Sequence, residues 1–152
     1  DILVVRRMVE PEIVRTLAAA STKSRAERLQ AHLLEEAAAR EKGDRATLVR
    51  LCGEFHLLLA ELAGNQVLVR LVTGLQALTC LAILLYAERE DACPPDEHSR
   101  IAAAIANNDG DLAAREMLHH LQHVEKDLQL DRDGPSLNDT IAWLRGEPAV
   151  DP

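Results

Sequence analysis

Residues 51–65, LCGEFHLLLAELAGN, carry the pattern that most constrains how this chain can fold. Apolar side chains, among them Leu48, Phe55 and Leu62, recur every three or four residues, which is typical of one face of an α-helix. The pattern stops at Gly64, a residue suited to the left-handed backbone conformation that ends many helices. The sequence therefore predicts a helix that ends at this glycine and has an apolar face to bury.

Cys52 and His56 stand four residues apart in this helix, so both side chains leave it on one face. A thiol and an imidazole beside an apolar stripe are either packing residues or metal ligands. His98 and His120 also lie next to apolar positions, on two later predicted helices. One such histidine is ordinarily a core residue with a hydrogen-bond partner, but three on three helices favour a divalent metal such as Zn, Ni or Cu.

His119 and His123 form a rival pair, four residues apart on one predicted helix. No glutamate follows His119 as it would in an HExxH motif, and the surroundings are polar, so a solvated face is predicted. Cys80 is predicted to lie in the core and Cys93 in a loop.

No nucleophile–base pair is visible in the sequence. A hydrolytic metalloenzyme needs an open metal position and a nearby general base. The best candidates for that base are Glu54 and Glu97, and the simplest interpretation of Glu97 is that it supports a helix start. The chain is therefore not expected to be an enzyme.

The composition favours an all-α domain. The 152 residues suit one compact unit, 47% are hydrophobic and only 2% are aromatic, so leucine and alanine, both strong helix formers, dominate the apolar mass. Capping and turn signals predict an antiparallel bundle of six or seven helices. The first expected helix ends near residue 20. The second begins at a Ser24–Glu27 capping box and ends near residue 43. The others cover 44–64, 65–89 (predicted to be central), 96–106, 110–130 and 137–145.

The net charge of −8 lacks the basic footprint of a nucleic-acid-binding domain. Three cysteines form no disulfide framework, which indicates free thiols in the cytoplasm. The longest apolar stretch contains Gln76 and Thr79 and is short for a membrane span, so no membrane association is expected. The chain begins inside an apolar pattern without an initiator methionine and is expected to be a fragment.

Three blocks of the sequence resemble the signature of a known family: RRMVEPEIVRTLAAAST, GEFHLLLAELAGN and EHSRIAAAIANNDGDLAAREMLHHL. They are similar, in the same order, to blocks of the FCD domain, the C-terminal effector-binding domain of FadR-subfamily GntR transcription regulators. The resemblance implies an effector-binding and dimerisation domain over residues 1–146, followed by a tail at 147–152. The family's winged helix-turn-helix domain, which contacts operator DNA, is absent from this chain.

The resemblance also implies a ligand set. Many family members hold a divalent metal through an aspartate and three histidines, which correspond here to Cys52, His56, His98 and His120. Because cysteine replaces the aspartate, either the fourth ligand is sulfur, which favours zinc, with nickel or another divalent ion as alternatives, or Cys52 does not ligate at all. A family arginine that faces the ligand pocket corresponds to Arg6. The family's effectors are mostly small carboxylates that can bind at open metal positions.

The function expected from the sequence is therefore that of a sensing domain of a cytoplasmic, homodimeric bacterial regulator, which binds a small organic acid at or near a metal. Three alternatives stay open. These are a metal-free regulator domain that binds an acyl group, a helical metalloenzyme of hydrolase type, and a helical interaction module with unliganded histidines.

Overall fold

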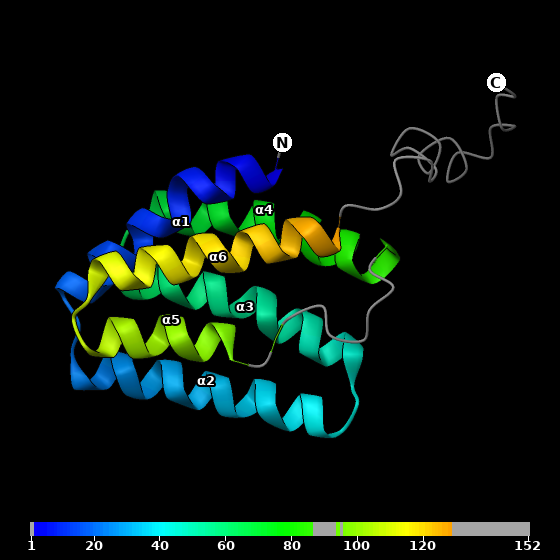
Figure 1. The fold of residues 1–152 in the computed structure, drawn as a ribbon, viewed down its shortest axis with the longest axis horizontal. Coiled ribbons are helices and arrows are strands. Elements are labelled where there is room, and N and C mark those ends of the chain that lie inside the picture. Colours follow the sequence, from blue (N-terminus) through cyan, green and yellow to red (C-terminus); the bar gives the residue numbers. More distant parts are fainter. Residues whose placement is uncertain (1, 87–93, 95, 129–152) are drawn as a thin grey trace, which may run out of the picture.

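The computed structural model describes residues 2–86, 94 and 96–128. These residues form six α-helices: α1 (Ile2–Ala19), α2 (Lys23–Glu41), α3 (Arg45–Ala63), α4 (Gln66–Tyr86), α5 (Glu97–Ala106) and α6 (Gly110–Asp127). Successive helices run in opposite directions (Figure 1), so the predicted all-α antiparallel bundle is confirmed. The expected helix at 137–145, the tail at 147–152 and Cys93 lie outside the described residues.

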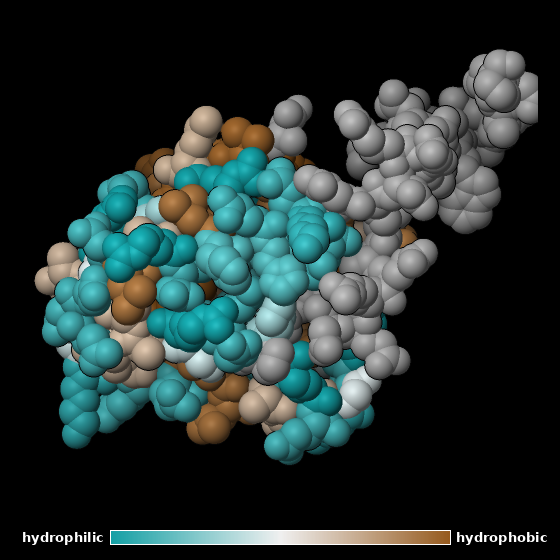
Figure 2. All heavy atoms as spheres, in the orientation of Figure 1, coloured by the Kyte–Doolittle hydropathy of each residue, from teal (hydrophilic) through white to brown (hydrophobic). Residues whose placement is uncertain are grey.

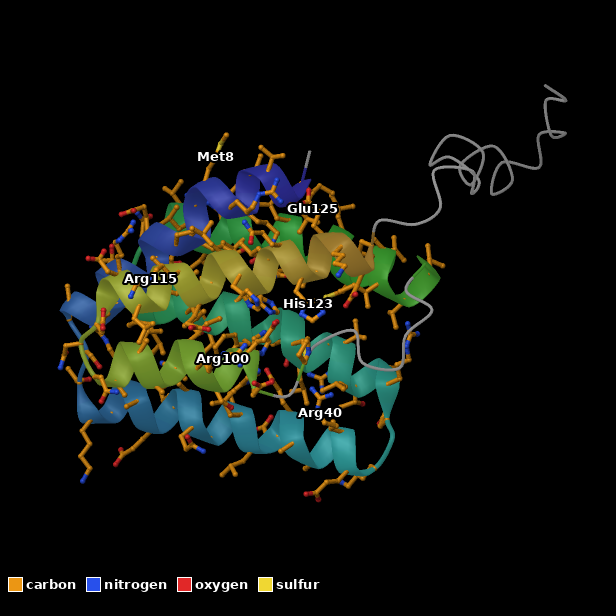
Figure 3. All side chains as sticks on the ribbon, in the orientation of Figure 1. Met8, Arg40, Arg100, Arg115, His123 and Glu125 are labelled. Atoms are coloured by element: carbon orange, nitrogen blue, oxygen red, sulfur yellow. The ribbon has the colours of Figure 1, made fainter. Side chains whose placement is uncertain are left out.

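Helix α3 runs through the middle of the bundle and packs against α1, α2 and α4 (Figure 1). Helix α6 packs against α1 and α5, and ion pairs join it to both. Arg7 of α1 pairs with Glu125 of α6, and Arg100 of α5 donates to Glu116 of α6 at 2.9 Å; Figure 3 labels Glu125 and Arg100. These contacts between helices bring their side chains to a common interior.

The predicted ends of α3 are confirmed. The Asp44 side chain accepts a hydrogen bond from the backbone N–H of Thr47 at 3.1 Å, and Gly64 ends the helix with a φ of 83°. The capping box predicted for α2 is wrong, because the side chain of Thr22, two residues earlier than Ser24, accepts the capping hydrogen bond from Arg25.

Helix α4 was predicted to be central because it is apolar nearly all round, and the structure contradicts this. By length and composition the segment Gln66–Leu85 could cross a membrane, yet only 22% of it is buried within the bundle. One side packs inward, and the other exposes six large apolar residues: Val67, Leu71, Leu78, Leu81, Leu84 and Leu85. By contrast, the face formed by α5 and α6 is mostly hydrophilic (Figure 2).

Candidate metal centre

The three histidines predicted as ligands meet in the middle of the bundle. The Nε2 atom of His120 lies 3.2 Å from Nε2 of His56 and 3.4 Å from Nε2 of His98. They come from α6, α3 and α5, and all three side chains are buried. Phe55, one residue before His56, stacks on the His98 ring with centroids 4.1 Å apart and thereby fixes the plane of that ring.

In all three cases a carboxylate from a different helix holds the other nitrogen of the ring. The Nδ1 atoms contact Glu10 (His56, 2.6 Å), Glu36 (His98, 2.9 Å) and Glu97 (His120, 2.8 Å). Because a carboxylate accepts hydrogen bonds, each Nδ1 carries the proton, which leaves each Nε2 with a lone pair. Carboxylates in this position orient metal-binding histidines and raise their basicity.

The spacing of the three Nε2 atoms suits a divalent cation. Two zinc–nitrogen bonds of roughly 2.0–2.1 Å at a tetrahedral angle hold their nitrogens about 3.3 Å apart. The two distances between Nε2 atoms, 3.2 and 3.4 Å, lie on either side of this value. With the ligand atoms of all three histidines within 4.8 Å of one another, the three lone pairs form a donor set that fits a zinc ion.

Arg6 joins this arrangement through Glu10. Its Nε donates to Glu10 at 2.6 Å and its Nη1 donates to Thr79 of α4 at 3.3 Å, and the side chain is buried. Burial by itself would raise the pKa of Glu10, but His56 and Arg6 outweigh it and lower that pKa to about 2. Burial, assisted by the Arg6 charge, lowers the pKa of His56 to about 3 although Glu10 opposes this. At neutral pH His56 is therefore a neutral imidazole, the form that binds metal.

The other two carboxylates are also ionised. Burial would raise the pKa of Glu36, but hydrogen bonds from His32 and His98 prevail and lower it to about 2. The same balance, with hydrogen bonds from His120 and a second histidine on α6, lowers the pKa of Glu97 to about 2. The sequence suggested only that Glu97 supports a helix start. The structure gives it a larger role, because it is buried and holds His120 of the centre.

His119 and His123 do not join the centre. His119 is 63% exposed in its side chain and His123 is 33% exposed, and both direct Nδ1 toward the Glu97 carboxylate, at 3.5 and 2.9 Å. Figure 3 shows His123 on the side of α6 nearest the start of α5. The two residues therefore form a partly solvated rim around Glu97.

Cys52 lies to one side of the three histidines. It is buried, and its Sγ falls within 4.8 Å of ligand atoms of Glu36 and His98, whereas the close group of three histidines does not include it. The position therefore allows either a sulfur ligand or a packing role, and the ligation of Cys52 remains a prediction.

Replacing Cys52 with alanine is expected to lower zinc affinity about tenfold or more if its thiolate ligates the metal. Cys80→Ala is the matched control, because Cys80 hydrogen-bonds the Val49 carbonyl at 3.6 Å and stands on α4. Competition with a zinc indicator measures both variants. Equal affinities of the Cys52 variant and the unaltered protein would leave Cys52 as a packing residue.

Glu10 and Glu36 were missed as functional residues by sequence reasoning, although a signal exists. Glu10 falls four residues after Arg6 and three before Ile13, so two charged residues lie in the buried stripe of α1. Glu36 similarly falls seven residues after the buried Leu29 of α2. A charge at a stripe position must find a buried partner, which here is a histidine.

These features define an all-α bundle with a buried centre of three histidines, each held by a carboxylate. Residues 1–123 match the FCD domain, and the chain belongs to the FCD domain family.

Two known proteins with similar sequences are transcription regulators by name. The chain is 26% identical over 129 residues to the HTH-type transcriptional repressor RspR of Escherichia coli (strain K12), a match covering 82% of this chain and 56% of RspR. The uncharacterized HTH-type transcriptional regulator YdfH of Shigella flexneri gives the same figures. The structure of Streptococcus agalactiae GntR superposes with a TM-score of 0.72 at 24% identity, over 83% of this chain and 57% of that one. This chain thus spans little more than half the length of these relatives.

Proposed function

We propose that this chain is the effector-binding and dimerisation domain of a cytoplasmic bacterial GntR-family transcription regulator and that it holds one zinc ion in the three-histidine centre. The observation that carries the proposal is the convergence of three Nε2 atoms at 3.2 and 3.4 Å, each on a ring whose Nδ1 is held by a carboxylate. When bound, the metal would supply a Lewis acid with an open position for an anionic ligand.

Arg6 supports an acidic effector. Its buried guanidinium lines a cavity of about 20 Å³ together with His56 and His120. This volume is close to that of one water molecule, so the packing of α4 would have to open for a small carboxylate to meet the metal side of the histidines and the Arg6 charge. Because Arg6 also contacts Thr79, a ligand there would act directly on the α1–α4 contact. Effector binding would therefore bias the packing of α4, the helix with the exposed apolar face.

The similar proteins named as regulators support a regulatory rather than an enzymatic role. Both carry the HTH label, and this chain matches little more than half of each of them. Operator DNA would be contacted by a winged helix-turn-helix domain outside this chain, and the effector would act on that domain through the bundle.

A thermal-shift screen of zinc-loaded protein against small carboxylates, with and without a chelator, tests the proposed function. A true effector at roughly 100 times its Kd should raise Tm by about 5–10 °C. The shift should vanish when the metal is removed. Tm shifts caused by a carboxylic acid that persist in chelator would favour a metal-free domain. Hydrolysis of ester or amide substrates would favour the metalloenzyme.

The outer face of α4 supports the homodimer. Val67, Leu71, Leu78, Leu81 and Leu85 follow one another at intervals of three, four or seven residues, which places them on one stripe, and all are exposed. Gly74 lies between the second and third of these, with no atom within 4 Å of the position its Cβ would take. An apolar stripe of this length, open at a glycine, suits the same helix of a second copy of this chain.

Changing both Leu78 and Leu81 to aspartate is expected to weaken dimerisation at least about a hundredfold, because charges would be buried in the apolar interface. Leu34→Asp on α2 is the control, since Leu34 is 62% exposed and lies off the stripe. Light scattering should give twice the chain mass of 16.7 kDa for the unaltered protein and the control. A mass of 16.7 kDa for the unaltered protein at high micromolar concentration would contradict the dimer.

A further inference from the structure

Cys52, Glu36 and His98 form a second group of donor atoms beside the candidate metal centre. The Cys52 sulfur, a Glu36 carboxylate oxygen and a His98 ring nitrogen all lie within 4.8 Å of one another, and all three residues are buried. They come from α3, α2 and α5. Thiolate, carboxylate and imidazole are the ligand types that zinc takes in proteins. The group therefore supplies three of the four ligands of a tetrahedral zinc site.

The two ring nitrogens of His98 face different groups. Its Nε2 lies 3.4 Å from Nε2 of His120 in the three-histidine centre, whereas its Nδ1 lies 2.9 and 3.0 Å from the two oxygens of Glu36. The close group of three histidines does not include the Cys52 sulfur. An ion bound by Cys52 and Glu36 would therefore take a position on the Nδ1 side of the His98 ring, separate from the three-histidine centre.

Small movements bring these donors to bonding distance of a zinc ion. Zinc bonds of about 2.0–2.2 Å to nitrogen and oxygen and about 2.3 Å to sulfur, at tetrahedral angles, place nitrogen about 3.4 Å from oxygen and about 3.6 Å from sulfur. The His98 Nδ1 and the Glu36 oxygen would separate by about 0.5 Å from their present 2.9 Å. The Cys52 sulfur, now within 4.8 Å, would approach by about 1.2 Å at most. Movements of this size are similar to ordinary atomic displacements in folded proteins, roughly 1 Å.

The charges inside the bundle also favour cations. In the described part of the chain, the buried charged residues are three glutamates and one arginine: Glu10, Glu36, Glu97 and Arg6. The three carboxylates are ionised, so together with one guanidinium they leave a net charge of −2, which one divalent ion in the three-histidine centre balances. A second divalent ion keeps the interior neutral if it displaces one proton from the Cys52 thiol and one from His98 Nδ1. The interior then contains no excess charge, whose burial would be costly.

We propose that Cys52, Glu36 and Nδ1 of His98 bind a second divalent cation of the thiolate-binding class, zinc or cadmium, beside the three-histidine centre. His98 then bridges the two ions, with Nε2 on the first and Nδ1 on the second, and both displaced protons pass to solvent. The three-histidine centre fills first, because its Nε2 lone pairs carry no proton, whereas the second position must lose two protons. This inference rests on the proposed function for the first ion, since His98 is shared.

Zinc content after dialysis and zinc K-edge X-ray absorption, at one and at two equivalents of zinc, test the second position. The unaltered chain should retain two ions, with sulfur scattering at about 2.3 Å absent at one equivalent and present at two. Cys52→Ala should retain one ion and show no sulfur at either load. Glu36→Gln, which keeps an oxygen to accept the hydrogen bond from His98, should also retain one. The control, Cys80→Ala on α4, should retain both ions.

His56→Ala separates the two proposals, because it removes one ligand of the three-histidine centre and none of the second position. This variant should bind its tightest zinc ion with sulfur scattering. Sulfur in the first equivalent of the unaltered chain would place Cys52 in the three-histidine centre and overturn the second position. One retained ion without sulfur would also overturn it and leave the proposed function intact. Absence of imidazole scattering at one equivalent would instead contradict the proposed function.

Discussion

Replacing His120 with alanine is expected to weaken zinc binding at least about a hundredfold, whereas replacing its neighbour His119 should leave the affinity unchanged within about twofold. His120 is buried, and its Nε2 faces both His56 and His98. His119 is 63% exposed, and its Nδ1 lies 3.5 Å from the Glu97 carboxylate. Adjacent positions on a helix point about 100° apart, so one of them can face the centre and the other cannot.

Competition between the protein and a chromogenic chelator measures both zinc affinities. The His119 and His120 variants are matched, because they change the same residue type to alanine on the same helix. The same experiment on His56 and His98 should give losses of similar size. The assignment would be reversed if His119→Ala abolished zinc binding and His120→Ala left it intact.

Replacing Glu10 with alanine is expected to lower the free energy of unfolding of the metal-free protein by about 3–5 kcal/mol. The change leaves the buried Arg6 guanidinium without its carboxylate and the Nδ1 of His56 without its acceptor. Urea denaturation followed by circular dichroism measures the loss. Glu54→Ala, which breaks an exposed pair with Arg50, should cost less than about 1 kcal/mol. Equal losses in the two variants would show that the Glu10 pairing contributes little.

The stabilisation by Glu10 should depend on pH in a defined direction. Its pKa falls from 4.5 to about 2 on folding, so the folded state favours the ionised carboxylate. The stability difference between the unaltered protein and Glu10→Ala should therefore be complete above about pH 5 and decrease as the pH falls toward 2.

Much of the fold is predictable from local signals. The periodicity around Phe55, the Asp44 cap and the Gly64 end are properties of a single helix, and the structure confirms all three. Helix α4 shows where such reasoning fails. Hydropathy is the same for a leucine buried in the core and for one exposed on the surface. An apolar helix at the edge of the bundle therefore cannot be distinguished by sequence from a central one.

The residues of the candidate centre likewise include some that the sequence predicts and some that it does not. The three histidines stand beside apolar positions and match blocks of the family, so their convergence could be anticipated. The carboxylates that hold them could not, because Glu10 lies 46 residues from His56 and Glu36 lies 62 residues from His98. Such pairs form only when the bundle brings distant helices together.

Zinc K-edge X-ray absorption of the chain loaded with one equivalent of zinc tests the central claim most directly. Three imidazole nitrogens at about 2.0–2.1 Å are expected, with clear imidazole ring scattering, and a sulfur contribution at about 2.3 Å if Cys52 ligates. A spectrum of oxygen ligands without imidazole scattering would contradict a metal centre at His56, His98 and His120.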